Sequence, residues 1–278
     1  MNKDWMKIAS IYIGTVIGAG FASGREIIEF FGMYGIKGIY GMIICGVLFS
    51  TIGSLLLIKI YNNGIRDFNQ LISTLWGKKF GFIIDMIIIF SLYTGFSVMI
   101  SGSGAIFKEE LNLPFSMGII IMTVLSFMVF LFNLKGLSLV NSILVPLLIL
   151  GIITISLYLN IREGCIFSNI EGVGLTKKGN FLSSSFLYMG SNSLIIIVVF
   201  SSLLPIIHNR KTAILGGMTG GIMLCILGLS ILTTTLIYYN EIWTLDVPML
   251  KICSYIGDGY RSLYAIILWI AMFTTALA

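Results

Sequence analysis

A glycine-rich segment near the N-terminus, GTVIGAGFASGRE at residues 14–26, has the clearest chemical potential in this sequence. Gly18 and Gly20 favour a break in a helix, because glycine is a poor helix former. A broken helix frees carbonyl oxygens that can bind a cation, and amides at the start of the next piece that can bind a carboxylate. Close helix packing is the alternative, since Gly14 with Gly18 forms a small-xxx-small pair, as does Gly20 with Gly24. The spacing does not match a dinucleotide-binding loop.

A second polar feature, YMGSNS at residues 188–193, interrupts a long apolar run. Asparagine and serine in the middle of a membrane segment are costly unless they face a cavity or a partner helix. Hydrogen bonding between helices is the alternative explanation. Two interrupted apolar segments far apart in the chain indicate a transporter built from inverted repeats.

Two further groups of residues could carry chemistry. In AMFTT at residues 271–275, the adjacent hydroxyls of Thr274 and Thr275 can bind a ligand or bond back to carbonyls of their own helix. Asp85 is the one acid well inside a predicted apolar segment, which raises proton coupling as an interpretation. Its nearness to Lys78 and Lys79 favours a structural role at the inner interface.

The composition requires a membrane around these residues. Hydrophobic residues make up 57% of the 278 positions, charged residues 10%, and the mean hydropathy is +1.01. Soluble domains carry about 25% charged residues, so a water-soluble enzyme and a nucleic-acid-binding protein are both excluded. One histidine and four dispersed cysteines provide no metal-binding cluster. With no HExxH motif, paired carboxylates or Ser/His pair, we expect no enzymatic activity.

The apolar runs predict an all-α polytopic membrane protein with about eight spans, because they are too continuous for barrel strands. The predicted spans are 6–31, 38–61, 80–107, 115–132, 137–160, 181–207, 213–239 and 260–278, with the first and sixth discontinuous. The distribution of Lys and Arg favours a cytoplasmic N-terminus in the cell inner (plasma) membrane. Because the last run is still apolar at Ala278, we expect the sequence to be truncated at its C-terminus.

The opening IGTVIGAGFASGREI, residues 13–27, resembles the YkvI-type bacterial membrane proteins. These are placed among amino-acid permeases of the amino acid–polyamine–organocation superfamily. The resemblance covers the whole chain, and the glycine-rich opening is its specific part. It implies a leucine-transporter-like inverted-repeat bundle of five plus five core helices. The chain would then be one transmembrane domain, 1–278, with a first repeat at 6–160 and an incomplete second repeat at 181–278.

The resemblance also implies a Na⁺ site between the first and eighth helices. Its donors would be the carbonyls of Gly14, Ile17 and Ala271 and the hydroxyls of Thr274 and Thr275. Hard cations prefer oxygen ligands, so the residue types agree with this assignment. The other sodium site of the fold uses an asparagine directly after the GxG, where this chain has Phe21, so we do not expect that site.

The substrate pocket implied by the fold lies between the two breaks. The amides of Gly18, Ala19 and Gly20 would bind a carboxylate, and polar contacts would come from Tyr188, Ser191 and Asn192. The Tyr93 hydroxyl would donate to that carboxylate or bond to another helix. Arg25 with Glu26 or Glu29 would form an outer gate, or these are ordinary charges of the outer face.

Together these expectations describe a secondary active transporter of a small zwitterionic solute, an amino acid, coupled to Na⁺ by alternating access. No cofactor other than the coupling ion is expected, and the partners would be the solute and the lipid bilayer, with no nucleic acid. The alternatives are H⁺-coupled transport and a non-transporting membrane sensor or scaffold of the same fold. The lack of a large soluble domain argues against a sensor.

Overall fold

The computed structural model describes residues 4–164 and 180–277, apart from some side chains within helices, and every regular element among them is a helix. The longer helices are α4 (Ile36–Asn63), α5 (Phe68–Glu109), α6 (Phe115–Phe130), α7 (Asn133–Glu163), α8 (Phe181–Ser201), α9 (Arg210–Ile237) and α12 (Asp258–Leu277). The short helices α10 (Tyr239–Ile242) and α11 (Pro248–Ser254) connect α9 to α12.

Six described helices are long and apolar enough to cross a membrane: Ile36–Asn63, Asp85–Lys108, Leu139–Glu163, Phe181–Ser201, Arg210–Ile237 and Asp258–Leu277. The two other predicted spans differ from these. One is the broken first segment, and the other is α6, whose 16 residues extend ~24 Å at 1.5 Å per residue. The chain is therefore a multi-pass helical membrane protein, and the count of eight spans stays a prediction.

The first apolar segment is broken as predicted, into α1 (Asp4–Val16), α2 (Ala19–Ser23) and α3 (Arg25–Phe30). Gly18 precedes α2 with an extended backbone. Gly24 separates α2 from α3 with a φ of +83°, a conformation that glycine adopts without steric cost. The glycines of this segment therefore interrupt the helix at two points.

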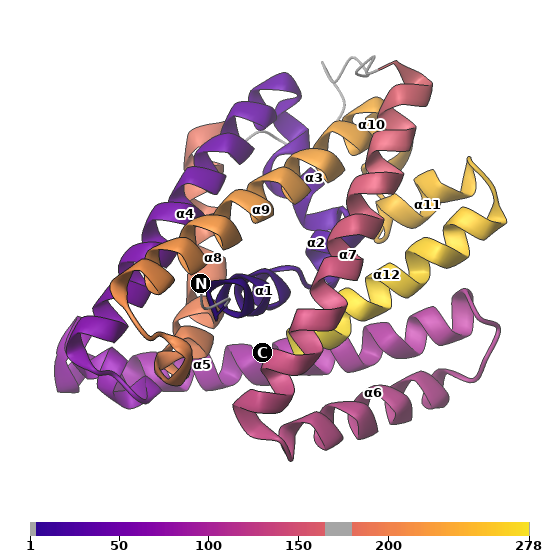
Figure 1. The fold of residues 1–278 in the computed structure, drawn as a ribbon. Helices are drawn as coiled ribbons and strands as arrows, with labels where there is room; N and C mark the ends of the chain where they lie inside the picture. The colour runs from indigo at the N-terminus through magenta and orange to yellow at the C-terminus, as the bar shows by residue number, and fades with distance from the viewer. Residues whose placement is uncertain (1–3, 165–179, 278) are drawn as a thin grey trace.

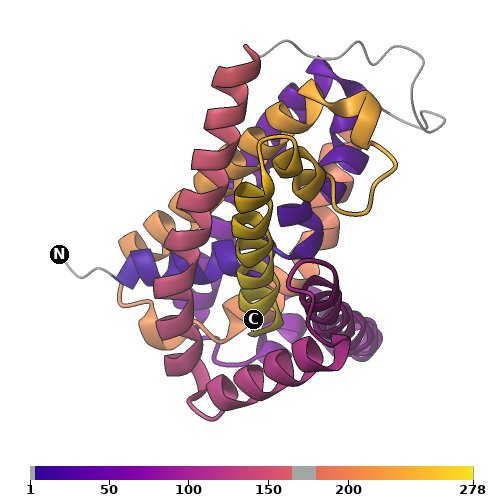
Figure 2. The same cartoon turned by 90° about the vertical axis from the view of Figure 1, so that its right-hand side faces the viewer.

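The piece α1 lies at the centre of the bundle, with α4, α8 and α9 on one side and α7 and α12 on the other (Figure 1). Turning the molecule by 90° shows α7 running beside α12, with α6 crossing below them (Figure 2). The Tyr12 side chain is completely buried, and its hydroxyl donates to the carbonyl of Phe49 in α4 at 3.0 Å. The broken segment is thus surrounded by protein, where irregular backbone is tolerated in a membrane.

Glycines also determine how closely α9 packs. A Cβ on Gly217 would lie 2.5 Å from the Ser54 backbone nitrogen of α4, and one on Gly220 would lie 2.5 Å from Tyr12 Cδ1 of α1. Two adjacent rows of glycines on α9 therefore face two different helices. This is the close approach that small residues permit between membrane helices.

The predicted interruption of the sixth segment is wrong, because α8 is helical from Phe181 to Ser201. The polar side chains satisfy themselves within the helix. Ser191 Oγ and Asn192 Nδ2 donate to the Tyr188 carbonyl at 2.9 and 3.0 Å, and Ser193 Oγ donates to Met189 at 2.7 Å. Hydroxyl and amide groups commonly bond back to carbonyls three or four residues earlier. The polar run therefore needs no open backbone.

Candidate ion and solute site at the broken first helix

Three oxygen atoms meet where α12 passes the break after α1. The Thr275 hydroxyl lies 3.0 Å from the Gly14 carbonyl oxygen and 2.9 Å from that of Ile17. A hydroxyl carries one proton and donates to one acceptor at a time, whereas both carbonyls are acceptors only. Three oxygens share one proton here, which is an arrangement that a cation would complete.

The other two predicted donors on α12 contact each other. Thr274 is fully buried, and its hydroxyl donates to the Ala271 carbonyl at 3.0 Å. The structure therefore brings Gly14, Ile17 and Thr275 together, while Ala271 and Thr274 are bonded to each other within α12. That all five bind one ion stays a prediction.

A cavity of about 740 Å³ lies beside this contact, between α3, α5, α8 and α12. It is lined by Tyr188, Ser191 and Asn192, which the sequence assigned to a substrate pocket, and by Thr275. Glu26 is the one acidic side chain, and there is no basic one, among its described lining residues. The cavity is otherwise mostly apolar, as solute sites usually are.

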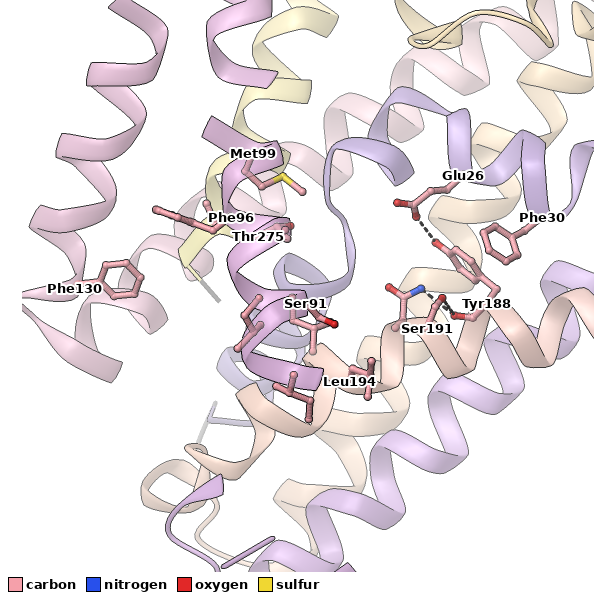
Figure 3. Close-up of a pocket in the computed structure, with 16 residues that line it drawn as sticks. Glu26, Phe30, Ser91, Phe96, Met99, Phe130, Tyr188, Ser191, Leu194 and Thr275 are labelled. Carbon is pink, nitrogen blue, oxygen red and sulfur yellow. Dashed lines mark hydrogen bonds between the residues drawn. The ribbon is translucent and has the colours of Figure 1, made fainter. Parts of the chain in front are cut away.

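Glu26 and Tyr188 face each other at one end of the cavity, with Phe30 beside the tyrosine ring (Figure 3). The Tyr188 hydroxyl donates to Glu26 Oε2 at 3.3 Å, and the ring centroids of Phe30 and Tyr188 are 4.9 Å apart. A carboxylate next to aromatic rings is a chemistry that recognises an ammonium group. The sequence placed Glu26 in an outer gate, and its position in the cavity was not predicted.

Gly18, Ala19 and Gly20 are not among the described residues that line this cavity. Ala19 and Gly20 line a second cavity of about 240 Å³, together with Arg25 and Glu110. The Glu26 carboxyl group occupies the space where a side chain on Gly20 would be. The structure therefore does not bring the amides of residues 18–20 to the cavity of Tyr188, Ser191 and Asn192.

Gly18 lies beside Thr275 instead. A Cβ on Gly18 would be 3.3 Å from Met99 Cε and 3.5 Å from Thr275 Cγ2. Its position connects the break in the first segment to the wall of the main cavity, which Met99 and Thr275 both line.

The predicted role of Tyr93 in this cavity is wrong. Its side chain is 72% exposed on the outer face of α5. The α5 residues that line the cavity recur at helical spacing, and they are Ile88, Ser91, Leu92, Gly95, Phe96 and Met99. Tyr93 points away from that face because a helix turns about 100° per residue.

The predicted gate residues separate into two groups. Arg25 binds Glu29 at 2.8 Å and donates to the carbonyls of Trp243 and Leu245 at 2.9 and 3.1 Å, which ties α3 to the segment after α10. Glu26 bonds to Tyr188 instead. The structure therefore pairs Arg25 with Glu29 and leaves Glu26 to the cavity.

Sequence reasoning missed Asn141, which is completely buried in α7 beside Gly14. Its signal was available, since an amide within a long apolar run is costly. Asp85 Oδ1 is buried and has no hydrogen-bond partner among the described residues, and Lys78 and Lys79, its expected partners, have side chains outside that set. Within the described residues no group of three or more His, Cys, Asp and Glu side chains could hold a metal ion.

No protein-family model matches this sequence. The chain is 30% identical over 274 residues to the uncharacterized membrane protein YkvI of Bacillus subtilis, covering 98% of this chain and 77% of that protein. It is 26% identical over 275 residues to the uncharacterized protein YyaD of the same organism, covering 98% and 78%.

Solved structures of the Eremococcus coleocola manganese transporter share the fold. A variant of that transporter matches with a TM-score of 0.63 and 14% identity, over 97% of this chain and 63% of that chain. Its complex with an aromatic bis-isothiourea compound matches with a TM-score of 0.61 and 16% identity, over 98% and 62%. This chain thus spans less than two thirds of the length of those structures, and the likeness shows the fold alone.

Proposed function

The chain belongs to the family of the bacterial membrane protein YkvI, and from that premise we propose that it is a secondary active transporter of a small zwitterionic, amino-acid-like solute, coupled to Na⁺. The observation that carries this proposal is the contact of Thr275 with the carbonyls of Gly14 and Ile17. Freed carbonyls at a broken helix are where transporters of this kind place their coupling ion.

The coupling between ion and solute would arise from the helices that the ion joins. Na⁺ between the three oxygens would replace the single shared proton contact and fix α1 against α12. Solute in the adjacent cavity would contact Thr275 from one wall and Tyr188 of α8 from the other. Ion and solute would then favour the same closed arrangement, and each would raise the affinity for the other.

The solute would be oriented by its two charged ends. Its ammonium group would bind Glu26, next to the rings of Phe30 and Tyr188. The ammonium group would attract the Glu26 carboxylate and move it away from Gly20. If it stayed beside Gly20, the Glu26 carboxylate would repel the carboxylate of the solute. The amides of residues 18–20 would then be open to the solute carboxylate.

Manganese is named for the structural neighbour, and the described residues of this chain favour a different cargo. The cavity offers one carboxylate, which is a weak donor set for a divalent metal ion. A metal-ligating cluster is absent from the described part of the chain. The shared architecture therefore supports transport, and the cavity chemistry supports an amine-bearing solute.

Proton coupling is the second candidate, and one observation favours it. Glu26 is the acid that lines the cavity, and the Tyr188 hydroxyl holds one of its oxygens. A carboxyl group inside a membrane transporter can carry a proton with the solute. A proton gradient that drives uptake in Na⁺-free buffer would favour this candidate.

The test is uptake of a panel of radiolabelled amino acids into proteoliposomes, with and without an inward Na⁺ gradient. We expect the gradient to stimulate uptake, Thr275→Val to abolish the stimulation, and Thr275→Ser, which keeps the hydroxyl, to retain it. Thr219→Val is the matched control, because the Thr219 hydroxyl bonds within α9 to Leu215.

Two outcomes would contradict the proposal. Unchanged Na⁺ stimulation in Thr275→Val would rule out this ion site. Solute binding without counterflow in liposomes would instead favour a sensor or scaffold that keeps the pocket and does not transport.

A further inference from the structure

Asn141 of α7 is a buried amide without a hydrogen bond. The residue is completely buried, and neither its Oδ1 nor its Nδ2 has a partner among the described residues. Buried side-chain polar atoms are paired in the large majority of cases, and a specific exception calls for an explanation such as an ion or a water. Asn141 is therefore a candidate ligand for a bound ion or water molecule.

The amide oxygen of Asn141 faces the backbone of Gly14. It lies 2.9 Å from the point that a Cβ on Gly14 would occupy, and Val145 Cγ2, one turn along α7, lies 3.0 Å from the same point. The missing side chain of Gly14 is what allows α7 to approach so closely. Gly14 is also one of the two residues whose carbonyls meet Thr275.

We propose that Asn141 supplies a further oxygen ligand, from α7, to the cation held by Gly14, Ile17 and Thr275. The inference rests on the proposed function, since it concerns the same ion site. It adds a third helix to that site, because α7 packs against both α1 and α12 (Figure 2).

The donor set also points to the charge of the ion. Carbonyl, hydroxyl and amide oxygens are all neutral, whereas divalent cations are usually held by carboxylates. A ligand set without a negative charge favours a monovalent hard cation such as Na⁺. Asn141 thereby contributes to selectivity as well as to affinity.

The experiment is equilibrium binding of radiolabelled Na⁺ to the purified protein in detergent, together with melting temperatures in Na⁺ and in choline. Asn141→Leu removes the oxygen at similar size, and Asn141→Asp keeps an oxygen and adds charge. Ser156→Ala is the matched control, because Ser156 is also buried in α7 and its hydroxyl also has no partner among the described residues.

We expect Asn141→Leu to weaken Na⁺ binding about ten- to a hundredfold, the range seen when groups around a metal site are lost. Its melting temperature in choline should stay at or above that of the wild type, because an unpaired buried amide is replaced by an apolar group. Asn141→Asp should bind Na⁺ more tightly and begin to accept Ca²⁺. Ser156→Ala should bind Na⁺ as the wild type does.

The outcomes separate the inference from the proposed function. Wild-type Na⁺ affinity in Asn141→Leu, with binding lost in Thr275→Val, would overturn the role of Asn141 and leave the ion site standing. A wild type that binds no Na⁺ would overturn both. If Asn141→Leu does not fold, Asn141→Asp decides: tighter Na⁺ binding supports the inference, and unchanged binding overturns it.

Discussion

Glu26 has one carboxylate oxygen held by the Tyr188 hydroxyl and lies at the end of the main cavity where Phe30 adds an aromatic ring. Its neighbour Arg25 points to Glu29 instead. Two adjacent residues therefore serve different parts of the molecule. The turn at Gly24 directs them, because its left-handed backbone sets a new axis for α3.

We predict that Glu26→Gln weakens binding of an amine-bearing solute by about ten- to a hundredfold, the equivalent of losing one charge-assisted hydrogen bond. A solute analogue without the ammonium group should bind the two proteins equally. The measurement is the affinity of each compound, obtained by calorimetry on purified protein. Glu241→Gln is the control, since Glu241 is exposed, accepts a hydrogen bond from Tyr255 and is not among the described lining residues of the cavity.

At this scale the sequence predicted the contact of Thr275 with the carbonyls of Gly14 and Ile17 better than it predicted which side chains line the main cavity. Thr275 could be paired with Gly14 and Ile17 because the family resemblance matches these residues by their order and spacing along the chain. Tyr93 could not be placed, since its exposure depends on the rotation of α5. Whether a side chain enters a cavity is decided by tertiary packing, which a single span does not encode.

At the scale of elements, the glycines of α9 allow this helix to pack closely against α1 and α4. We predict that Gly217→Ala destabilises the protein by about 1–3 kcal/mol, because the added methyl group would press on the Ser54 backbone of α4. Melting in detergent measures the effect. Gly190→Ala is the matched control, since nothing lies near Gly190 in the middle of α8. That control should be neutral or stabilising by up to about 1 kcal/mol.

A loss of stability in Gly190→Ala equal to that in Gly217→Ala would show that helix packing is not the cause. The sequence located small residues in the first segment and offered close packing and a break as alternative explanations there. It did not identify the glycine rows of α9, which matter only because two helices approach from different sides.

The helix α8 shows why a break was predicted in two segments and is present in only one of them. Two features interrupt the first segment, an extended Gly18 and a left-handed Gly24. The polar run of α8 has only Gly190, and its serines and asparagine bond back within the helix. Polar side chains are thus a weaker indicator of an open helix than closely spaced glycines.

At the scale of the whole molecule, the broken segment is tied down at both ends. Asp4 binds Lys7 at 3.0 Å and His208, just before α9, at 3.1 Å. Arg25 binds the segment after α10. Alternating access requires the broken segment to move relative to its neighbours, so these ties would open or close as it does.

We predict an acid-dependent loss of the tie at Asp4. The hydrogen bond from Lys7 is the main cause that holds the pKa of Asp4 below its usual value of 3.8, and His208 adds to it. Because the folded pKa is lowered, the stabilisation is fully present above pH 3.8 and is lost as the pH falls through the lowered value. The difference in melting temperature between wild type and Asp4→Asn should therefore be present at about pH 5 and vanish in stronger acid.

A Lys7→Met variant checks the cause of that shift. Without the lysine, the Asp4 pKa should move back toward its usual value, and the acid-dependent loss should begin at higher pH. An identical acid profile in Lys7→Met and the wild type would contradict the assignment.

The contact between Thr275 and the carbonyls of Gly14 and Ile17 also has a consequence for how the protein is made. These carbonyls are synthesised at the start of the chain, and the hydroxyl that meets them is added near residue 278. Until α12 has been synthesised, the carbonyls of Gly14 and Ile17 in the first segment lack the hydroxyl that they contact in the folded protein. A stalled or shortened nascent chain would leave these carbonyls without that hydroxyl inside the bilayer.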